Sequence, residues 1–222
     1  MRSLFDTDGF LMRVLTKIAD TVWLNILFLI CSIPIFTIGA SITALYYVSF
    51  KTIKDEEGYI TKDFFRSFKE NFKQSTIIWI VLLVLYIIFG FELTTLLAMN
   101  TSMADAGIVI AMIPGLLILF VGLYVFPLLS RFENTTKATI KNALFLSIAN
   151  IPKTLLALVI TIAIPVVCLS DMKLFPLVPI CAFSVVVQLN CSLFYGIFEK
   201  LMPKNTDETR VESDSQEMQE KI

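Results

Sequence analysis

Three amide side chains lie inside the long apolar runs of this sequence, where a polar group is costly and therefore informative. Asn25 lies in the first run, and Gln188 and Asn190 lie in the last. An amide carries hydrogen-bond donors and an acceptor, so in apolar surroundings it either joins two helices or contacts a ligand such as a sugar or an ion. Hydrogen bonding between helices is the commoner role, and both interpretations stay open here.

A second candidate site is the segment IPIFTIGAS at residues 33–41, in which Pro34 and Gly39 interrupt an apolar run. Proline removes a backbone donor and glycine relaxes the backbone, so we expect the helix to break between them. A broken helix of this kind can present backbone groups to a transported substrate. A plain turn between two short helices has the same sequence pattern and is the alternative.

Residues suited to enzyme chemistry are scarce. The sequence has no histidine, which removes the commonest general base and the usual zinc ligand. The GxSxG, Walker, GxGxxG and HExxH motifs are missing as well. The four cysteines form no CxxC pair and lie in apolar runs, at Cys31, Cys168, Cys181 and Cys191. We therefore expect no enzyme activity, no cofactor and no metal site.

The composition indicates that these residues are held in a membrane. Hydrophobic residues make up 56% of the 222 residues and charged residues only 17%, against roughly 25% charged in a soluble domain. About 20 helical residues cross a ~30 Å hydrocarbon core. Five apolar stretches approach or exceed that length, at residues 22–50, 75–98, 107–130, 154–170 and 174–198. The sequence predicts an all-α polytopic integral membrane helical bundle, with residues 1–203 as one embedded domain.

Lysine and arginine predict which connections face the cytoplasm. Lysine and arginine occur at the N-terminus, in residues 51–73, in residues 131–153 and in the C-terminal segment, whereas residues 99–106 contain neither residue. An inside N-terminus and an inside 51–73 connection require the first apolar stretch to cross twice or to re-enter. We therefore favour six membrane helices, or five plus a re-entrant pair, over five crossings with an outside N-terminus. The expected location is the cell membrane, multi-pass, with both termini cytoplasmic.

Two basic segments predict amphipathic helices that lie in the membrane interface, with lipid as their partner. Their apolar positions share one helical face: Phe64, Phe65, Phe68 and Phe72 in residues 62–73, and Ile140, Ala143, Leu144 and Ile148 in residues 136–148. The basic residues form no wide basic field, so no nucleic acid partner is expected. Residues 204–222 are polar and acidic, and we predict a disordered cytoplasmic tail.

Residues 11–73 resemble the YesL family of bacterial membrane proteins. They run from LMRVLTKIAD through the IPIFTIGAS segment to FFRSFKENFK. Residues 127–156, PLLSRFENTTKATIKNALFLSIANIPKTLL, are similar to a second region of that family. The molecular function of the family is unknown, and it offers no binding residues to carry over. Its genes often lie beside genes for sugar uptake and polysaccharide degradation, which implies an association with carbohydrate use.

Two functions are compatible with these residues. The first is an accessory or regulatory membrane component associated with carbohydrate uptake, for which the resemblance implies a sugar permease component as partner. The alternative is a transporter of a small molecule such as a sugar or oligosaccharide, with Asn25, the break from Pro34 to Gly39, Gln188 and Asn190 near its path. The oligomeric state stays open.

Overall fold

The computed structural model describes residues 4–54, 58–99, 101–170 and 178–201, and the regular elements within them are all helical. The α-helices are α1 (Leu4–Ser32), α2 (Ile38–Ile53), α3 (Ile60–Ala98), α4 (Ser102–Arg131), α5 (Thr136–Ala149), α6 (Ile151–Ser170) and α7 (Phe183–Glu199). Within these residues, α1, α3, α4, α6 and α7 provide five segments long and apolar enough to cross a membrane. The predicted all-α membrane bundle is confirmed.

The first apolar stretch breaks where its proline predicts. α1 ends at Ser32, and a short 3-10 turn (Ile35–Thr37) leads into α2. Pro34 has an extended backbone, with φ −74° and ψ 119°, so the helical path cannot pass through it. α2 then runs for 16 residues, which is about 24 Å at the helical rise.

Side-chain contacts show that α1 runs parallel to α3. The indole N–H of Trp23 donates to Thr61 at the start of α3, and that of Trp79 donates to the backbone carbonyl of Ile35 just after α1. Residue numbers therefore increase in the same direction along α1 and α3. The N-terminal part of α1 and the start of α3 consequently lie at the same end of the molecule.

α2 runs in the opposite direction. Gly39 at its start lies against Ser75, and Lys51 at its end forms a 3.0 Å ion pair with Asp63, twelve positions earlier on α3. The chain thus doubles back within the first apolar stretch, as the distribution of charge predicts. Because α2 is shorter than the ~30 Å core and packs among other helices, it fits a re-entrant arm. Which side of the membrane this end faces stays a prediction.

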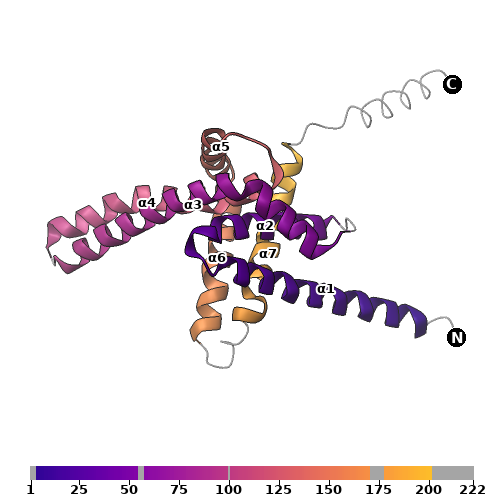
Figure 1. Ribbon diagram of the computed structural model, residues 1–222. Coiled ribbons are helices and arrows are strands. Elements are labelled where there is room, and N and C mark those ends of the chain that lie inside the picture. Colours follow the sequence, from indigo (N-terminus) through magenta and orange to yellow (C-terminus); the bar gives the residue numbers. More distant parts are fainter. Residues whose placement is uncertain (1–3, 55–57, 100, 171–177, 202–222) are drawn as a thin grey trace, which may run out of the picture.

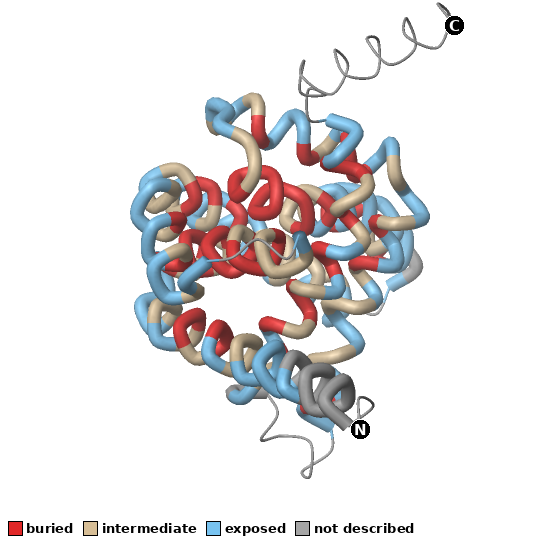
Figure 2. Tube along the Cα trace, turned by 90° about the vertical axis from the view of Figure 1, so that its right-hand side faces the viewer, coloured by how far each residue is buried: buried red, intermediate tan, exposed pale blue. Residues whose placement is uncertain are grey.

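α2 is the centre of the packing. Ten of its sixteen residues are buried, and many of them are small, such as Gly39, Ala40 and Ala44. Small residues let helix backbones approach closely, which is how helices associate inside a membrane. At its far end the Phe50 ring lies 5.6 Å from that of Phe198 on α7. Figure 2 shows that the buried residues gather in the middle of the molecule.

Two helical hairpins project from this centre in different directions, α3–α4 and α6–α7 (Figure 1). In the α3–α4 hairpin, glycines of α4 receive large side chains of α3: Gly115 lies against the Phe89 ring and Gly122 against the Tyr86 hydroxyl. Its outward faces carry exposed apolar residues, among them Ile87, Ile88, Phe91, Val109, Ile110 and Ile113. Such faces suit contact with lipid or with another membrane protein.

The prediction that residues 62–73 place an apolar face in the membrane interface is wrong. These residues form the first turns of α3, a single 39-residue helix, and the Phe64 side chain is fully buried in the core. Phe68 packs against the same core, while Phe65 points outward. The spacing that produces an amphipathic helix also suits packing on a neighbouring helix, and here α2 supplies that neighbour.

Residues 136–149 do form a separate helix, α5, but its buried face differs from the predicted one. Thr139, Ala143, Leu146 and Ser147 are buried, whereas Ile148 is half exposed. Ala143 alone is common to both faces, and the helix against which α5 mainly packs is α4. The predicted tail, residues 204–222, and the short connection at 171–173 lie outside the described residues.

Candidate functional site

Asn25 joins α1 to the start of α7. Its side chain is fully buried, and its Oδ1 accepts a 3.0 Å hydrogen bond from the backbone N–H of Ser184. This N–H lies where a π-helical turn, Val178–Ala182, passes into α7. Backbone donors at such a junction need a partner other than the regular helical carbonyl. Asn25 therefore has a packing role at the α1–α7 contact.

Gln188 and Asn190 make two further helix contacts. The Gln188 amide donates to the Thr21 hydroxyl of α1 over 3.1 Å, and the Asn190 amide donates to the Thr161 hydroxyl of α6 over 2.9 Å. The three amides predicted from the sequence thus serve separate contacts. Of the three, only Asn190 also lines the central cavity.

The backbone at the break is satisfied by the protein itself. The Thr37 hydroxyl donates to the carbonyl of Cys31 over 2.6 Å, and the Thr37 backbone N–H donates to the carbonyl of Pro34 over 2.9 Å. The carbonyl of Ile35 accepts from the Trp79 indole at 2.8 Å. These carbonyls are therefore already occupied, so Pro34 marks a turn between two helices.

Gly39 matters for its size. A Cβ at this position would lie 2.5 Å from the Cβ of Trp79 and 2.6 Å from the carbonyl oxygen of Ser75. Both distances are far below a normal contact of about 3.5–4.0 Å. The glycine lets α2 touch the backbone of α3. From the sequence we attributed the residue to the break, although the small residues that follow it could have signalled a close helix contact.

A cavity of about 330 Å³ lies between α1, α2, α3, α4, α6 and α7. Its walls are mostly apolar and rich in aromatic rings, which come from Phe28, Tyr46, Trp79, Tyr86, Phe126 and Phe183. Leu119 of α4 and Ile162 of α6 belong both to this lining and to the exposed apolar surface. The cavity is thus reached from the side, between helices that face lipid.

Asn190 is the most distinctive polar group of this cavity. The residue is only 1% exposed, and its Oδ1 is buried without a hydrogen-bond partner among the described residues. Leaving a buried acceptor unpaired costs about 1–3 kcal/mol. Thr161 and Tyr46, which lie beside this amide, are the site residues that sequence reasoning missed. A threonine or tyrosine within an apolar run is common, so the sequence alone does not indicate that it contacts a buried amide.

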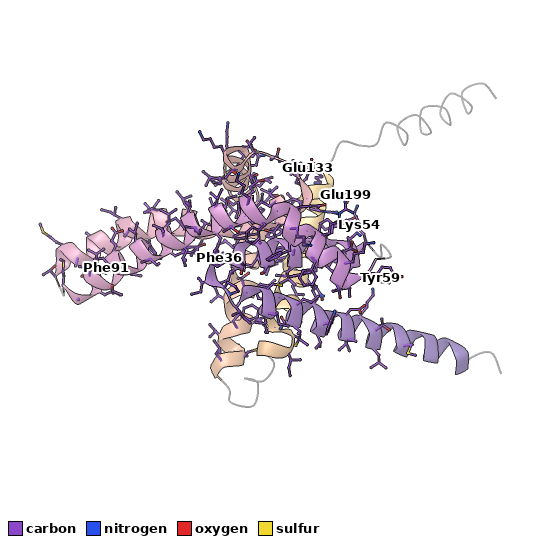
Figure 3. The ribbon with its side chains drawn as sticks, in the orientation of Figure 1. Phe36, Lys54, Tyr59, Phe91, Glu133 and Glu199 are labelled. Carbon is purple, nitrogen blue, oxygen red and sulfur yellow. The ribbon has the colours of Figure 1, made fainter. Side chains whose placement is uncertain are left out.

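The C-terminal ends of α2, α4 and α7 meet on one side of the molecule. Lys54, Arg131 and Glu199 line a small pocket there, and the Arg131 guanidinium lies 5.1 Å from the centre of the Phe50 ring. Cations next to helix C-termini offset the negative ends of the helix dipoles, which suits Lys54 and Arg131. In Figure 3, Lys54 and Glu199 lie far from Phe91 at the tip of the α3–α4 hairpin.

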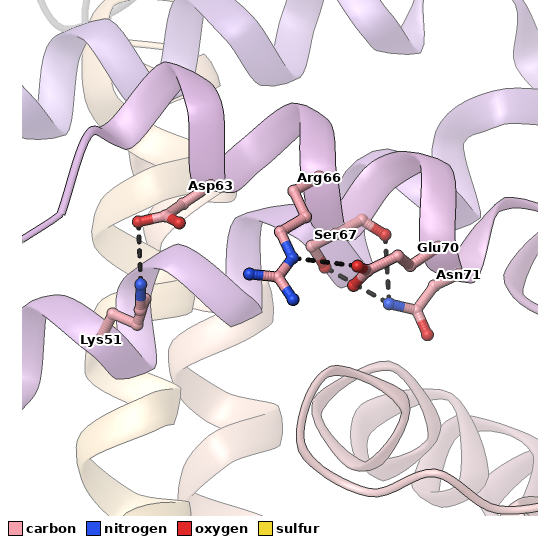
Figure 4. A network of polar contacts seen from close by, with 6 residues as sticks. All are labelled: Lys51, Asp63, Arg66, Ser67, Glu70 and Asn71. Carbon is pink, nitrogen blue, oxygen red and sulfur yellow. Dashed lines mark hydrogen bonds and ion pairs between the residues drawn. The ribbon is translucent and has the colours of Figure 1, made fainter.

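A second group of charges lies on the first turns of α3. Lys51 and Asp63 pair across α2 and α3, Arg66 pairs with Glu70 at 2.9 Å, and the Asn71 amide donates to Ser67 (Figure 4). Among the described residues, no group of three or more His, Cys, Asp or Glu side chains could hold a metal ion. The absence of enzyme activity stays a prediction.

Residues 21–93 match the family described as "Protein of unknown function, DUF624". This segment reaches from α1 through α2 to most of α3, and so includes the break, Gly39 and Trp79. Neither a curated protein nor a solved structure matches the chain. The sequence pattern that this chain shares with the family is therefore the reversing α1–α2–α3 unit.

Proposed function

We propose that this chain is an accessory or regulatory component of the cell membrane, associated with carbohydrate uptake, that acts by contact with other membrane molecules. The association with carbohydrate rests on the resemblance to the YesL family, with which the match of residues 21–93 is consistent. The proposed partner class is a component of a sugar permease.

The observation that carries this proposal is how the intramembrane amides are used. Asn25 and Gln188 join α1 to α7, and Asn190 joins α7 to α6. A sugar path needs a series of polar groups to replace the water that the sugar leaves behind. The cavity that Asn190 lines is mostly apolar. This arrangement favours a protein that binds over one that conducts a polar solute.

The contact surface that we propose is the α3–α4 hairpin. It projects from the packed centre (Figure 1), and apolar side chains cover its outward faces. A hairpin that stands apart from its own bundle can pack against helices of a second membrane protein. Phe91, 74% exposed near the tip, is a suitable reporter, and Phe145 on α5, 71% exposed, is its matched control.

The test is to place a photoreactive phenylalanine analogue at Phe91 or at Phe145 in cells grown on a polysaccharide. We expect irradiation to link the Phe91 variant to a permease component, and the Phe145 variant to give no such product. Oligosaccharide uptake in a deletion strain should fall. If no permease component is linked to Phe91 and uptake in the deletion strain is normal, the proposal is wrong.

The alternative function is transport of a small molecule, and one observation favours it. Asn190 offers an unpaired acceptor at a cavity among six helices, and binding sites of transporters also lie between membrane helices. Transport by the isolated protein distinguishes this function from the accessory role, because an accessory component moves no solute without its partner.

A further inference from the structure

The orientation of the Asn190 amide follows from its neighbours. The Thr161 hydroxyl donates its single proton to the carbonyl of Ala157 at 2.7 Å, so its oxygen can only accept from Asn190. The Nδ2 group of Asn190 therefore faces Thr161, and Oδ1 is the atom left over. This assignment makes the unpaired atom an acceptor, with which a ligand that carries a donor could pair.

The cavity has the size and lining for an apolar molecule. Its volume of about 330 Å³ is roughly twice that of the ~150 Å³ apolar cavity known to hold benzene. Binding of water in a mostly apolar cavity is unfavourable, because a buried water needs two to four polar partners. Trp79 offers no further donor, since its indole N–H is already bonded to Ile35.

The lining of the cavity reaches the apolar outer surface of the helices. Leu119 and Ile162 line the cavity and are also exposed on helices long and apolar enough to span a membrane. A molecule dissolved in the lipid can therefore enter from the side without crossing water. Charged groups are missing from the cavity lining, which disfavours an ionised ligand.

We propose that this cavity is a binding site for a lipophilic alcohol from the bilayer, whose apolar body fills the aromatic-lined space and whose hydroxyl donates to Oδ1 of Asn190. The site serves ligand binding and is independent of the carbohydrate association proposed above. It gives the unpaired acceptor a partner in the bound state.

Trp79 lines the cavity, and its fluorescence provides the test. In a Trp23→Phe background Trp79 is the remaining tryptophan of the chain, and 10-bromodecan-1-ol is titrated into the protein in detergent micelles. We expect saturable quenching. The methyl ether of the same probe, which cannot donate, should bind about 5–10-fold more weakly, as expected for the loss of one buried hydrogen bond. Equal binding of alcohol and ether would overturn the proposal.

Two variants connect this preference to the residue. Asn190→Leu should bind the alcohol and the ether equally, because the acceptor is gone. Thr161→Val is the matched control: it removes the partner of Nδ2 but leaves Oδ1 in place, so the preference for the alcohol should persist. Quenching of Trp23 in a Trp79→Phe protein measures non-specific partition. Quenching of Trp79 that is no more saturable than that of Trp23 would also overturn the proposal.

Discussion

Replacing Gly39 by alanine tests the contact on which the packed centre depends. The added Cβ would lie 2.5 Å from the Cβ of Trp79 and 2.6 Å from the carbonyl oxygen of Ser75. The first atom is fixed to the backbone of α3 and the second belongs to it, so no side-chain rotation relieves the clash. α2 and α3 must separate by roughly 1 Å to restore normal contacts.

Two opposing effects set the magnitude. Overpacking of this kind costs about 1–3 kcal/mol and occasionally more. Alanine in place of glycine within a helix otherwise stabilises by up to about 1 kcal/mol. Separation of α2 from α3 also strains the Lys51–Asp63 pair and the Trp79–Ile35 hydrogen bond. We expect Gly39→Ala to lower the free energy of unfolding by about 1–2 kcal/mol.

The assay is unfolding in mixed micelles with increasing SDS, followed by tryptophan fluorescence. Gly196→Ala on α7 is the matched control, because no heavy atom outside its own helix turn lies within 4 Å of the added Cβ. That variant should unfold at the same SDS fraction as the native chain or at a higher one. The reasoning is refuted if Gly39→Ala is as stable as Gly196→Ala.

Three further predictions concern the polar contacts and the chain direction. Asn25→Leu should lower the free energy of unfolding by about 1–3 kcal/mol in the same SDS titration, because the Ser184 N–H loses its acceptor. Gln188→Leu should lower it by less, and equal losses for the two variants would contradict this. Double-mutant cycles should give a larger coupling for Lys51–Asp63, with side chains 23% and 15% exposed, than for Arg66–Glu70, at 65% and 58%; the reverse order would count against the packing of α2 on α3. The third test labels single cysteines in a chain without native cysteines, using a maleimide that cannot cross the membrane. Tyr59→Cys and Leu201→Cys should react from the cytoplasmic side, and Met99→Cys should react from the outside. Labelling of Tyr59→Cys and Met99→Cys from the same side would refute the helix directions.

The helices and the reversal of the chain could be predicted from the sequence because their signals are local. Pro34 together with Gly39 favours a break, whereas Pro114, Pro127 and Pro165 lie inside continuous helices. The lengths of the apolar runs set the spans. The basic residues at both ends of the first stretch required the chain to return, although they could not show that α2 is short and enclosed. Those features depend on the packing of α2, whose buried residues include Gly39, Ala40 and Ala44, against α3 and α7.

The partners of the candidate residues could not be predicted, because they are distant in the chain. Asn25 meets the backbone of Ser184, 159 positions away, and Gln188 meets Thr21, 167 positions away. A buried amide indicates that a partner exists, but its spacing does not identify that partner. The same limit explains the error at Phe64, since an apolar helical face looks alike whether it meets lipid or protein.

Transport by the purified protein in sealed lipid vesicles tests the proposed function most directly. The vesicles contain the chain alone, and uptake of a labelled oligosaccharide is compared with that of protein-free vesicles. An accessory component predicts equal uptake in both, because the cavity lining is mostly apolar and the amides Asn25 and Gln188 hold helices together. Saturable uptake that is lost in the Asn190→Leu variant would contradict the proposal and establish the chain as a transporter.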